Sequence, residues 1–234
     1  MFGVLFNCLT VIIGSIIGML FRNLIPKKMT DGVMVGIGLC TVYIGIDGAL
    51  KGENTLVLIL SMAIGAIIGY ALDIDGKINS LADIVTGKFT KNGDSKGASQ
   101  GFVTASLIFC VGAMTIVGSI QAGVSGDNTL LITKSILDLV SSLALAATFG
   151  FGVLLSVAFV FAFQGGLVLL SGFIAPYLTL SLQNEMICAG SVLIIGLGLN
   201  IIGVTKIKVA NYLPAMFIAP FLTPWLNKLV EVIS

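Results

Sequence analysis

Long apolar runs separated by short polar segments recur along the whole chain. A helix needs about 20 apolar residues to cross ~30 Å of hydrocarbon, and the runs have about this length. The runs predict transmembrane helices at 3–21, 31–50, 55–72, 101–122, 128–149, 152–175, 185–203 and 209–230. The fifth and sixth runs are continuous, and "TFGFG" at 148–152 is the expected break, because glycines favour turns. The pattern predicts an all-α polytopic membrane protein of about eight spans.

The composition agrees with this class. Hydrophobic residues make up 57% of the chain and charged residues only 10%, whereas about a quarter of the residues of a soluble domain are charged. The first basic residue, Arg22, follows the first apolar run instead of preceding it. A cleaved signal peptide carries its positive charge first, so we interpret this run as a retained span.

The basic residues indicate the orientation. If the eight spans alternate, nine basic residues fall on one side of the membrane and two, Lys51 and Lys228, fall on the other. The nine are Arg22, Lys27, Lys28, Lys77, Lys88, Lys91, Lys96, Lys206 and Lys208. Positive residues are enriched in cytoplasmic loops, so we expect a multi-pass cell-membrane protein with both termini outside. Trp225 falls near the predicted outer interface, where aromatic residues are common.

One sizeable polar segment, residues 73–100, separates the third and fourth spans and is predicted to be a cytoplasmic loop. Ile74, Ile78, Leu81 and Val85 have helical spacing, which favours a short amphipathic helix on the inner membrane surface. The following "TKNGDSKGASQ" has the composition of a flexible linker. We interpret the segment as a solvated tether between two halves of one membrane domain, residues 1–234, in preference to the alternative of a regulatory site.

Short sequence similarities indicate an internal repeat. "IGIDGALKGENTL" at 44–56 resembles "GSIQAGVSGDNTL" at 118–130, and "GLGLNIIGVTKIKV" at 196–209 is a weaker relative. "GVLFN" near the start also resembles "GVLLS" at 152–156. These matches predict two three-span repeats, 3–72 and 152–221, around a central helix pair at 101–150. Five spans separate their starts, so the second copy would be inverted, as in many transporters.

The same alignment places Asp47, Gln121 and Asn200 at equivalent positions beside glycines near predicted helix ends. Non-helical backbone at membrane depth occurs only where it is buried or lines water. One hypothesis is therefore that three polar tips of broken helices meet in a pathway. The alternative is that all three are turn residues outside the membrane.

A charged pair lies within the fifth apolar run. Lys134, Asp138, Ser141 and Ser142 share one helix face, and Lys134 can pair with Asp138. A charge near mid-membrane costs ~3 kcal/mol on insertion scales and nearly always faces a partner or water. The pair could serve an ion pathway or hold helices together. Gln164, beside two glycines in the sixth run, adds another polar group.

The run "CVGAMTIVGSIQAGVSGDNTLLITKSILDLVSSLALAATFGFGVLLS" resembles the signature of a prokaryotic membrane family called domain of unknown function 554. The similarity extends over essentially the whole chain. It implies a multispan bacterial protein of a family without an established activity, some members of which are labelled transport proteins, channels or pumps. The resemblance supplies neither a substrate nor site residues.

Three function classes follow. We expect a transporter or channel for an ion or small solute, with Na⁺ or H⁺ as the coupling ion, because hard cations prefer oxygen ligands. An enzyme is disfavoured, since the chain has no histidine and Asp47 and Asp138 are the only candidates for an aspartate pair. The alternative is a non-transporting scaffold, sensor or assembly protein.

No resident cofactor is expected, and the metal content stays open. The expected partners are the lipid bilayer and the solute, a homo-oligomer is left open, and the net charge of +1 argues against nucleic acid.

Overall fold

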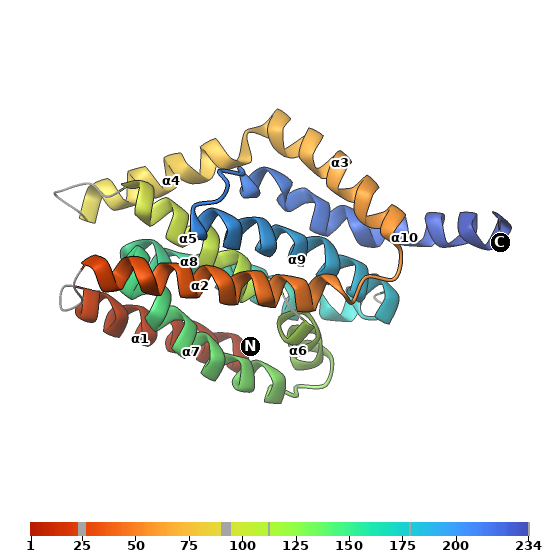
Figure 1. Cartoon of the computed structure of the whole chain (residues 1–234). Helices are drawn as coiled ribbons and strands as arrows, with labels where there is room; N and C mark the ends of the chain where they lie inside the picture. The colour runs from red at the N-terminus through yellow and green to blue at the C-terminus, as the bar shows by residue number, and fades with distance from the viewer. Residues whose placement is uncertain (23–26, 90–94, 112, 178, 234) are drawn as a thin grey trace. The chain divides into compact units, whose positions relative to one another are not determined.

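The chain consists of helices and the turns that join them (Figure 1). The computed structural model describes residues 1–22, 27–89, 95–111, 113–177 and 179–233, and no strand occurs in these ranges. The helices are α1 (Phe2–Arg22), α2 (Lys27–Ala49), α3 (Thr55–Leu72), α4 (Ile74–Phe89), α5 (Ser95–Cys110), α6 (Ala113–Val124), α7 (Thr129–Phe149), α8 (Phe151–Ile174), α9 (Leu180–Ile202), the 3₁₀ turn η1 (Val209–Tyr212) and α10 (Leu213–Ile233).

Six segments of the described chain are long and apolar enough to cross a membrane. They are α1, α3, α7, most of α8, α9, and Val209–Leu226, which includes η1 and the first part of α10. The helices α5 and α6 form a pair bent by 59° that would make a seventh span, and α2 has only a shorter apolar part, Val35–Ala49. The all-α polytopic class is therefore confirmed, whereas the count of eight spans is not.

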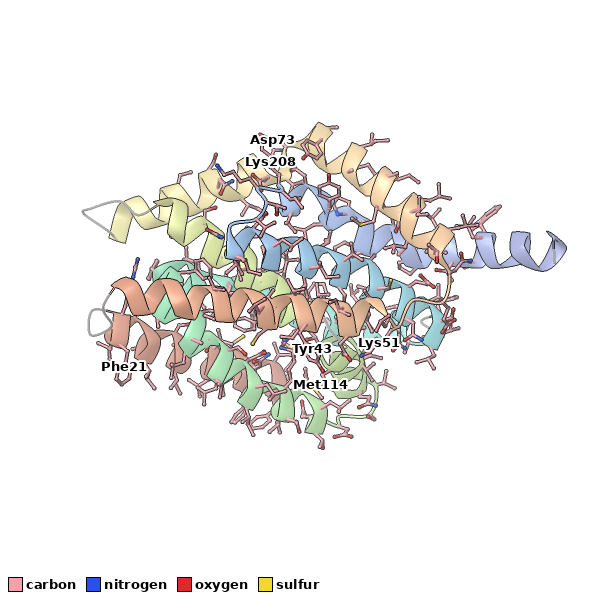
Figure 2. All side chains as sticks on the ribbon, viewed as in Figure 1. Phe21, Tyr43, Lys51, Asp73, Met114 and Lys208 are labelled. Carbon is pink, nitrogen blue, oxygen red and sulfur yellow. The ribbon has the colours of Figure 1, made fainter. Side chains whose placement is uncertain are left out.

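Large apolar side chains cover the outside of the helices. Figure 2 labels three of them, Phe21, Tyr43 and Met114, whose exposed fractions are 50%, 72% and 42%. A water-facing surface would not carry so many exposed apolar side chains, whereas lipid is as apolar as the side chains themselves. These faces fit helices that contact lipid.

The helices divide into two compact units. The first unit contains Met1–Ile37 and Lys77–Pro176, and the second contains Gly38–Gly76 and Tyr177–Ser234. Each unit takes helices from both halves of the sequence. The proposed repeats, 3–72 and 152–221, stay a prediction.

In the first unit, α1 runs parallel to α7 at very short range (Figure 1). A Cβ atom added at Gly14 would lie 2.5 Å from the backbone oxygen of Leu139, and one added at Gly18 would lie 2.2 Å from that of Leu143. Small residues at such positions let two backbones approach closely, which is how helices associate in lipid.

The pair α5 and α6 follows α8 in the same unit. A Cβ atom at Gly152, near the start of α8, would meet the backbone oxygen of Ala98 in α5 at 1.8 Å. Near the end of α8, the backbone oxygen of Val168 lies 2.4 Å from the Cβ position of Gly123 in α6. The bent pair therefore runs parallel to α8.

In the second unit, α9 packs antiparallel to the second half of α2. Gly38 lies against Gly198, whereas Gly48 lies against Ser191. The helices α3 and α10 are antiparallel as well, because Gly65 meets Ala215 at the start of α10, and Gly69 meets the backbone of Asn211 in the preceding turn η1. Glycines again occupy the close contacts.

The polar segment 73–100 is more ordered than the sequence suggested. The predicted amphipathic helix is present as α4, and its position on a membrane surface stays a prediction. The predicted linker at 90–100 is wrong from Ser95 onward, because α5 begins there and extends the fourth span toward its N-terminus. Residues 90–94 lie outside the described residues.

Candidate functional site

An ion pair inside the first unit is the centre of the candidate site. Lys134 and Asp138 lie four residues apart on α7 and bond to each other through Nζ and Oδ2. Their exposed fractions are only 6% and 5%. Asp138 lies about 14 Å from Thr129 along the axis of α7, at 1.5 Å per residue. The pair is therefore buried near the middle of a candidate span.

The other partners of the pair come from helices that are distant in sequence. The ring of Phe109, near the end of α5, has its centroid 5.7 Å from Nζ of Lys134, which is cation–π range. The side chain of Asn7, on α1, is within hydrogen-bonding reach of the Asp138 carboxylate. Three helices thus contribute to the immediate surroundings of the two charges.

Asn7 connects the ion pair to α8. Its Nδ2 atom donates a hydrogen bond of 3.2 Å to Oε1 of Gln164, and both side chains are fully buried. The amide oxygen of Asn7 and the amide nitrogen of Gln164 have no partner within the described residues. Buried polar atoms are almost always paired in proteins or hold water, so one acceptor and one donor are available here.

Further unpaired polar atoms occupy the interior of the same unit. They are the hydroxyl oxygens of Ser15, Thr104, Ser106 and Ser119. An unpaired buried hydroxyl or amide costs about 1–3 kcal/mol. Waters or an ion bound to these groups would remove much of this cost.

The helix that carries Phe109 is interrupted directly after it. The end of α5 and the start of α6 meet at a 59° bend, and the hydroxyl of Thr115 on α6 donates a 2.9 Å hydrogen bond to the backbone oxygen of Phe109. Interrupted helices in the membrane are tolerated only where protein or an aqueous path surrounds them. The interruption lies beside Lys134, which Phe109 contacts.

Two further residues of the predicted stripe lie on α7. Ser142 is buried one turn beyond Asp138, donates to the backbone oxygen of Leu139 at 3.0 Å, and packs against Gly14. Ser141 is half-buried. The structure therefore brings together Lys134, Asp138 and, through Asn7, Gln164, whereas Ser142 serves the contact with α1.

The three predicted polar tips occupy different places. Gln121 is exposed near the end of α6 in the first unit, and Asp47 is exposed in the last turn of α2 in the second. Asn200, near the end of α9, closes the following turn: its Nδ2 donates to the oxygen of Ile207 at 2.7 Å and its Oδ1 accepts from Thr205 at 2.7 Å. Within the second unit Asp47 and Asn200 lie toward opposite ends of the α2–α9 pair, so the structure does not bring them together.

The similar motifs at 52–56 and 126–130 have a common structural role. In each, the threonine is the first residue of a long helix, α3 or α7. Asn54 accepts from the backbone of Leu56, and the side chain of Asn128 accepts from the backbone of Gly3 at 2.9 Å. The motifs therefore start helices and anchor them to neighbours.

Asn7 is the site residue that the sequence reasoning missed. An amide inside the first apolar run was the available signal, but its partners are Asp138 and Gln164, which are distant in sequence. No group of three or more histidine, cysteine or acidic side chains capable of holding a metal occurs among the described residues.

Comparisons with known proteins find similarity to uncharacterised proteins, one of them described as a membrane protein. The chain is 34% identical to the "Uncharacterized membrane protein YdfK" of Bacillus subtilis (strain 168) over 224 residues, 94% of each chain. It is 26% identical to the "Uncharacterized protein YqgA" of Escherichia coli (strain K12) over 227 residues, 95% of this chain and 97% of that protein. No solved structure matches significantly. The family described as "Protein of unknown function (DUF554)" matches residues 2–224, and the chain belongs to this family of membrane proteins.

Proposed function

We propose that the protein is a transporter or channel for an ion or small solute in the cell membrane, with a cation as the coupling or transported species. The buried Lys134–Asp138 pair is the observation that supports this best. Ionisable side chains inside transmembrane segments are expensive and usually mark ion or substrate pathways. The proposal assigns no enzymatic activity to the site.

The surroundings of the pair favour a pathway over a purely structural contact. The order lysine before aspartate is the less favourable one for an i,i+4 pair on a helix, so local helix stability is a weak reason for it. The interrupted helix at Phe109 and the unpaired groups of Asn7 and Gln164 lie beside the charges. Transporters place discontinuous helices at their binding sites in the same way.

The packing of corresponding helices supports the inverted repeat on which the proposal draws. In the predicted alignment α1 corresponds to α8, α2 to α9 and α3 to α10. Contacts of Asn7 with Gln164 and of Arg22 with Gly150 make α1 antiparallel to α8, and the other two pairs are antiparallel as well. A twofold axis in the membrane plane relates inverted repeats in this way.

In the proposed mechanism the Asp138 carboxylate exchanges partners. At rest it is neutralised by Lys134 and held by Asn7. A cation that reaches the carboxylate displaces the ammonium group of Lys134, which keeps its contact with the face of Phe109. Oxygen atoms of Asn7 and nearby hydroxyls are suitable further ligands, because Na⁺ and similar hard cations prefer oxygen.

The test is ion flux in proteoliposomes, measured with Na⁺, K⁺ and H⁺ gradients in turn. Asp138→Asn keeps the side-chain volume and removes the charge, and should abolish flux. The control is Asp127→Asn, which removes an exposed carboxylate from the turn before α7 and should leave flux unchanged. Normal flux in Asp138→Asn would refute the mechanism.

The double variant separates transport from structural support. If the pair only holds helices together, Lys134→Met combined with Asp138→Asn should recover both stability and flux. We expect recovery of stability without flux, because no carboxylate remains to bind the cation. The absence of flux in the wild type for every ion and solute tried would favour a scaffold or sensor.

A further inference from the structure

A second buried carboxylate, Glu185, lies in the second unit, and the proposed pathway does not use it. It belongs to an early turn of α9 and is 1% exposed. The predicted span 185–203 begins at this residue, whereas α9 begins at Leu180 and therefore carries Glu185 inside the helix. A carboxylate is almost never fully buried without a partner, so its surroundings require an explanation.

One oxygen of Glu185 is fully used by the turn between α2 and α3. Oε1 accepts two backbone hydrogen bonds, from the N–H of Glu53 at 2.8 Å and from that of Asn54 at 2.7 Å. Asn54 is the N-cap of α3, so Glu185 binds where the free N–H groups of that helix begin. A helix N-terminus is equivalent to about half a positive charge, which offsets part of the negative charge.

The other oxygen has no such partner. Oε2 is buried and accepts no hydrogen bond from any described residue. Lys51, the basic residue of this turn, is labelled in Figure 2. It is exposed, and it forms no ion pair within the described residues. The charge of Glu185 is therefore only partly compensated, and its Oε2 atom has no hydrogen-bond partner among the described residues.

The turn that binds Glu185 also carries backbone oxygen atoms. The turn packs directly on α9: a Cβ atom at Gly52 would lie 2.5 Å from Sγ of Cys188, and one at Gly48 would lie 2.0 Å from Oγ of Ser191. The turn follows the C-terminal end of α2 at Ala49, where carbonyl groups lose their helical partners and the helix dipole is negative. Among the residues that the structure describes, the backbone oxygen of Ala49 accepts one hydrogen bond, from the N–H of Gly52 at 3.2 Å.

We propose that Glu185 and the turn at 49–54 form a cation site in the second unit, with Oε2 of Glu185 as the charged ligand and backbone oxygens and water as the others. The occupant is a hard monovalent cation of the Na⁺ or K⁺ class. Ca²⁺ takes six to eight oxygen ligands, usually including several carboxylates, and no cluster of three acidic or thiol groups exists among the described residues. The proposal does not depend on transport through the site at Asp138.

The experiment measures the thermal stability of the purified protein in detergent. Trp225 lies on α10 in the same unit as Glu185, and it is the only tryptophan, so its fluorescence reports on this unit. Melting is followed in NaCl, KCl and choline chloride at equal ionic strength. A cation that binds only the folded state stabilises it by RT ln(1 + [L]/Kd), so the melting temperature keeps rising as the cation concentration increases. We expect melting temperatures several degrees higher in NaCl or KCl than in choline chloride, with a rise that increases with the logarithm of the cation concentration.

Glu185→Gln should remove this rise, because glutamine keeps the acceptor for the two N–H groups and loses the charge. Glu53→Gln is the matched control: it neutralises the exposed carboxylate of the same turn, which accepts from Ser181 and Asn184, and should keep the rise. Asp138→Asn should also keep it, which separates this site from the proposed pathway. If Glu185→Gln does not fold, Glu185→Asp should fold and require a different cation concentration to reach the same rise in melting temperature.

Three results would overturn the proposal. The first is a wild-type protein with equal melting in all three salts. The second is a cation-dependent rise that persists in Glu185→Gln. The third is stabilisation at lower pH in choline without any effect of Na⁺ or K⁺, which would identify a proton site instead.

Discussion

The stability of variants that lack Lys134 or Asp138 provides a direct test of whether this ion pair is buried. Removing one partner of a buried ion pair leaves an uncompensated charge and costs about 3–5 kcal/mol. At about 2–4 °C per kcal/mol for a chain of this size, Lys134→Met and Asp138→Asn should each lower the melting temperature by about 6–20 °C. The double variant should melt within a few degrees of the wild type, because neutral replacements of a buried pair are often tolerated.

The assay must report on the first unit. Trp225 belongs to the second unit, so its fluorescence is unsuitable here. Cys8 and Cys110 lie in the first unit and are 7% and 1% exposed, and Cys110 is near enough to interact electrostatically with Lys134 and Asp138. With Cys40 and Cys188 replaced by serine, a fluorogenic thiol reagent therefore follows the unfolding of this unit alone.

The wild type, the two single variants and the double variant form a double-mutant cycle, which also shows whether the two side chains act together. Their coupling is the difference between the double variant and the sum of the single variants. Strong coupling, with recovery in the double variant, is expected from the bond between Nζ and Oδ2. Single variants that melt within 2 °C of the wild type, about 1 kcal/mol at most, would mean that the pair is solvated, and the argument from buried charge would fail.

Three further predictions concern packing, pH and orientation. Gly14→Ala should destabilise the protein by about 1–3 kcal/mol, because its Cβ atom would lie 2.5 Å from a backbone oxygen of α7, whereas Gly166→Ala meets open space and should be neutral in the same melting assay. The pKa of Glu53 is lowered by hydrogen bonds from Asn184 and a neighbouring serine. The stabilisation of the fold by the Glu53 carboxylate should therefore be present above the unfolded carboxyl pKa of about 4.3 and be lost as the pH falls through the lower folded pKa. A difference in melting temperature between the wild type and Glu53→Gln that stays constant from pH 7 to acid would contradict this. Single cysteines at Glu53 and Lys206, in a cysteine-free background, should react with an impermeant maleimide on intact cells at position 53 only, and the opposite result would reverse the predicted orientation.

The positions of most helices could be predicted from the sequence because hydrophobicity is a local property. Seven of the eight apolar runs coincide with a candidate span or with the bent pair of α5 and α6. The Lys134–Asp138 contact was predictable for the same reason, since a spacing of four residues brings two side chains together on any helix. The bend after Cys110 was not predicted, because glycines near a helix contact and glycines at a break look alike in sequence.

The partners of the charged pair could not be predicted from one sequence. Asn7 and Gln164 are 157 residues apart, and no periodicity records which helices become neighbours. Asn200 illustrates the reverse difficulty. A polar residue beside glycine at a helix end fits a pathway and a turn equally well, and its bonds to Thr205 and Ile207 became visible only with the folded turn.

Among the residues whose burial the structure describes, each unit buries one carboxylate, Asp138 or Glu185, and the two are compensated by different means. Asp138 has a full positive charge beside it on the same helix, so a cation that binds there must compete with Lys134. Glu185 has two backbone N–H groups and the end of a helix, which provide about half a charge and cannot be displaced. Under the two proposals, an incoming cation therefore replaces a partner at Asp138 and adds to the existing partners at Glu185. Exchange of partners is suited to a site that must release its ion during transport, whereas addition is suited to a site that keeps its ion and stabilises the fold. We therefore expect flux to depend on Asp138 and cation-dependent melting to depend on Glu185.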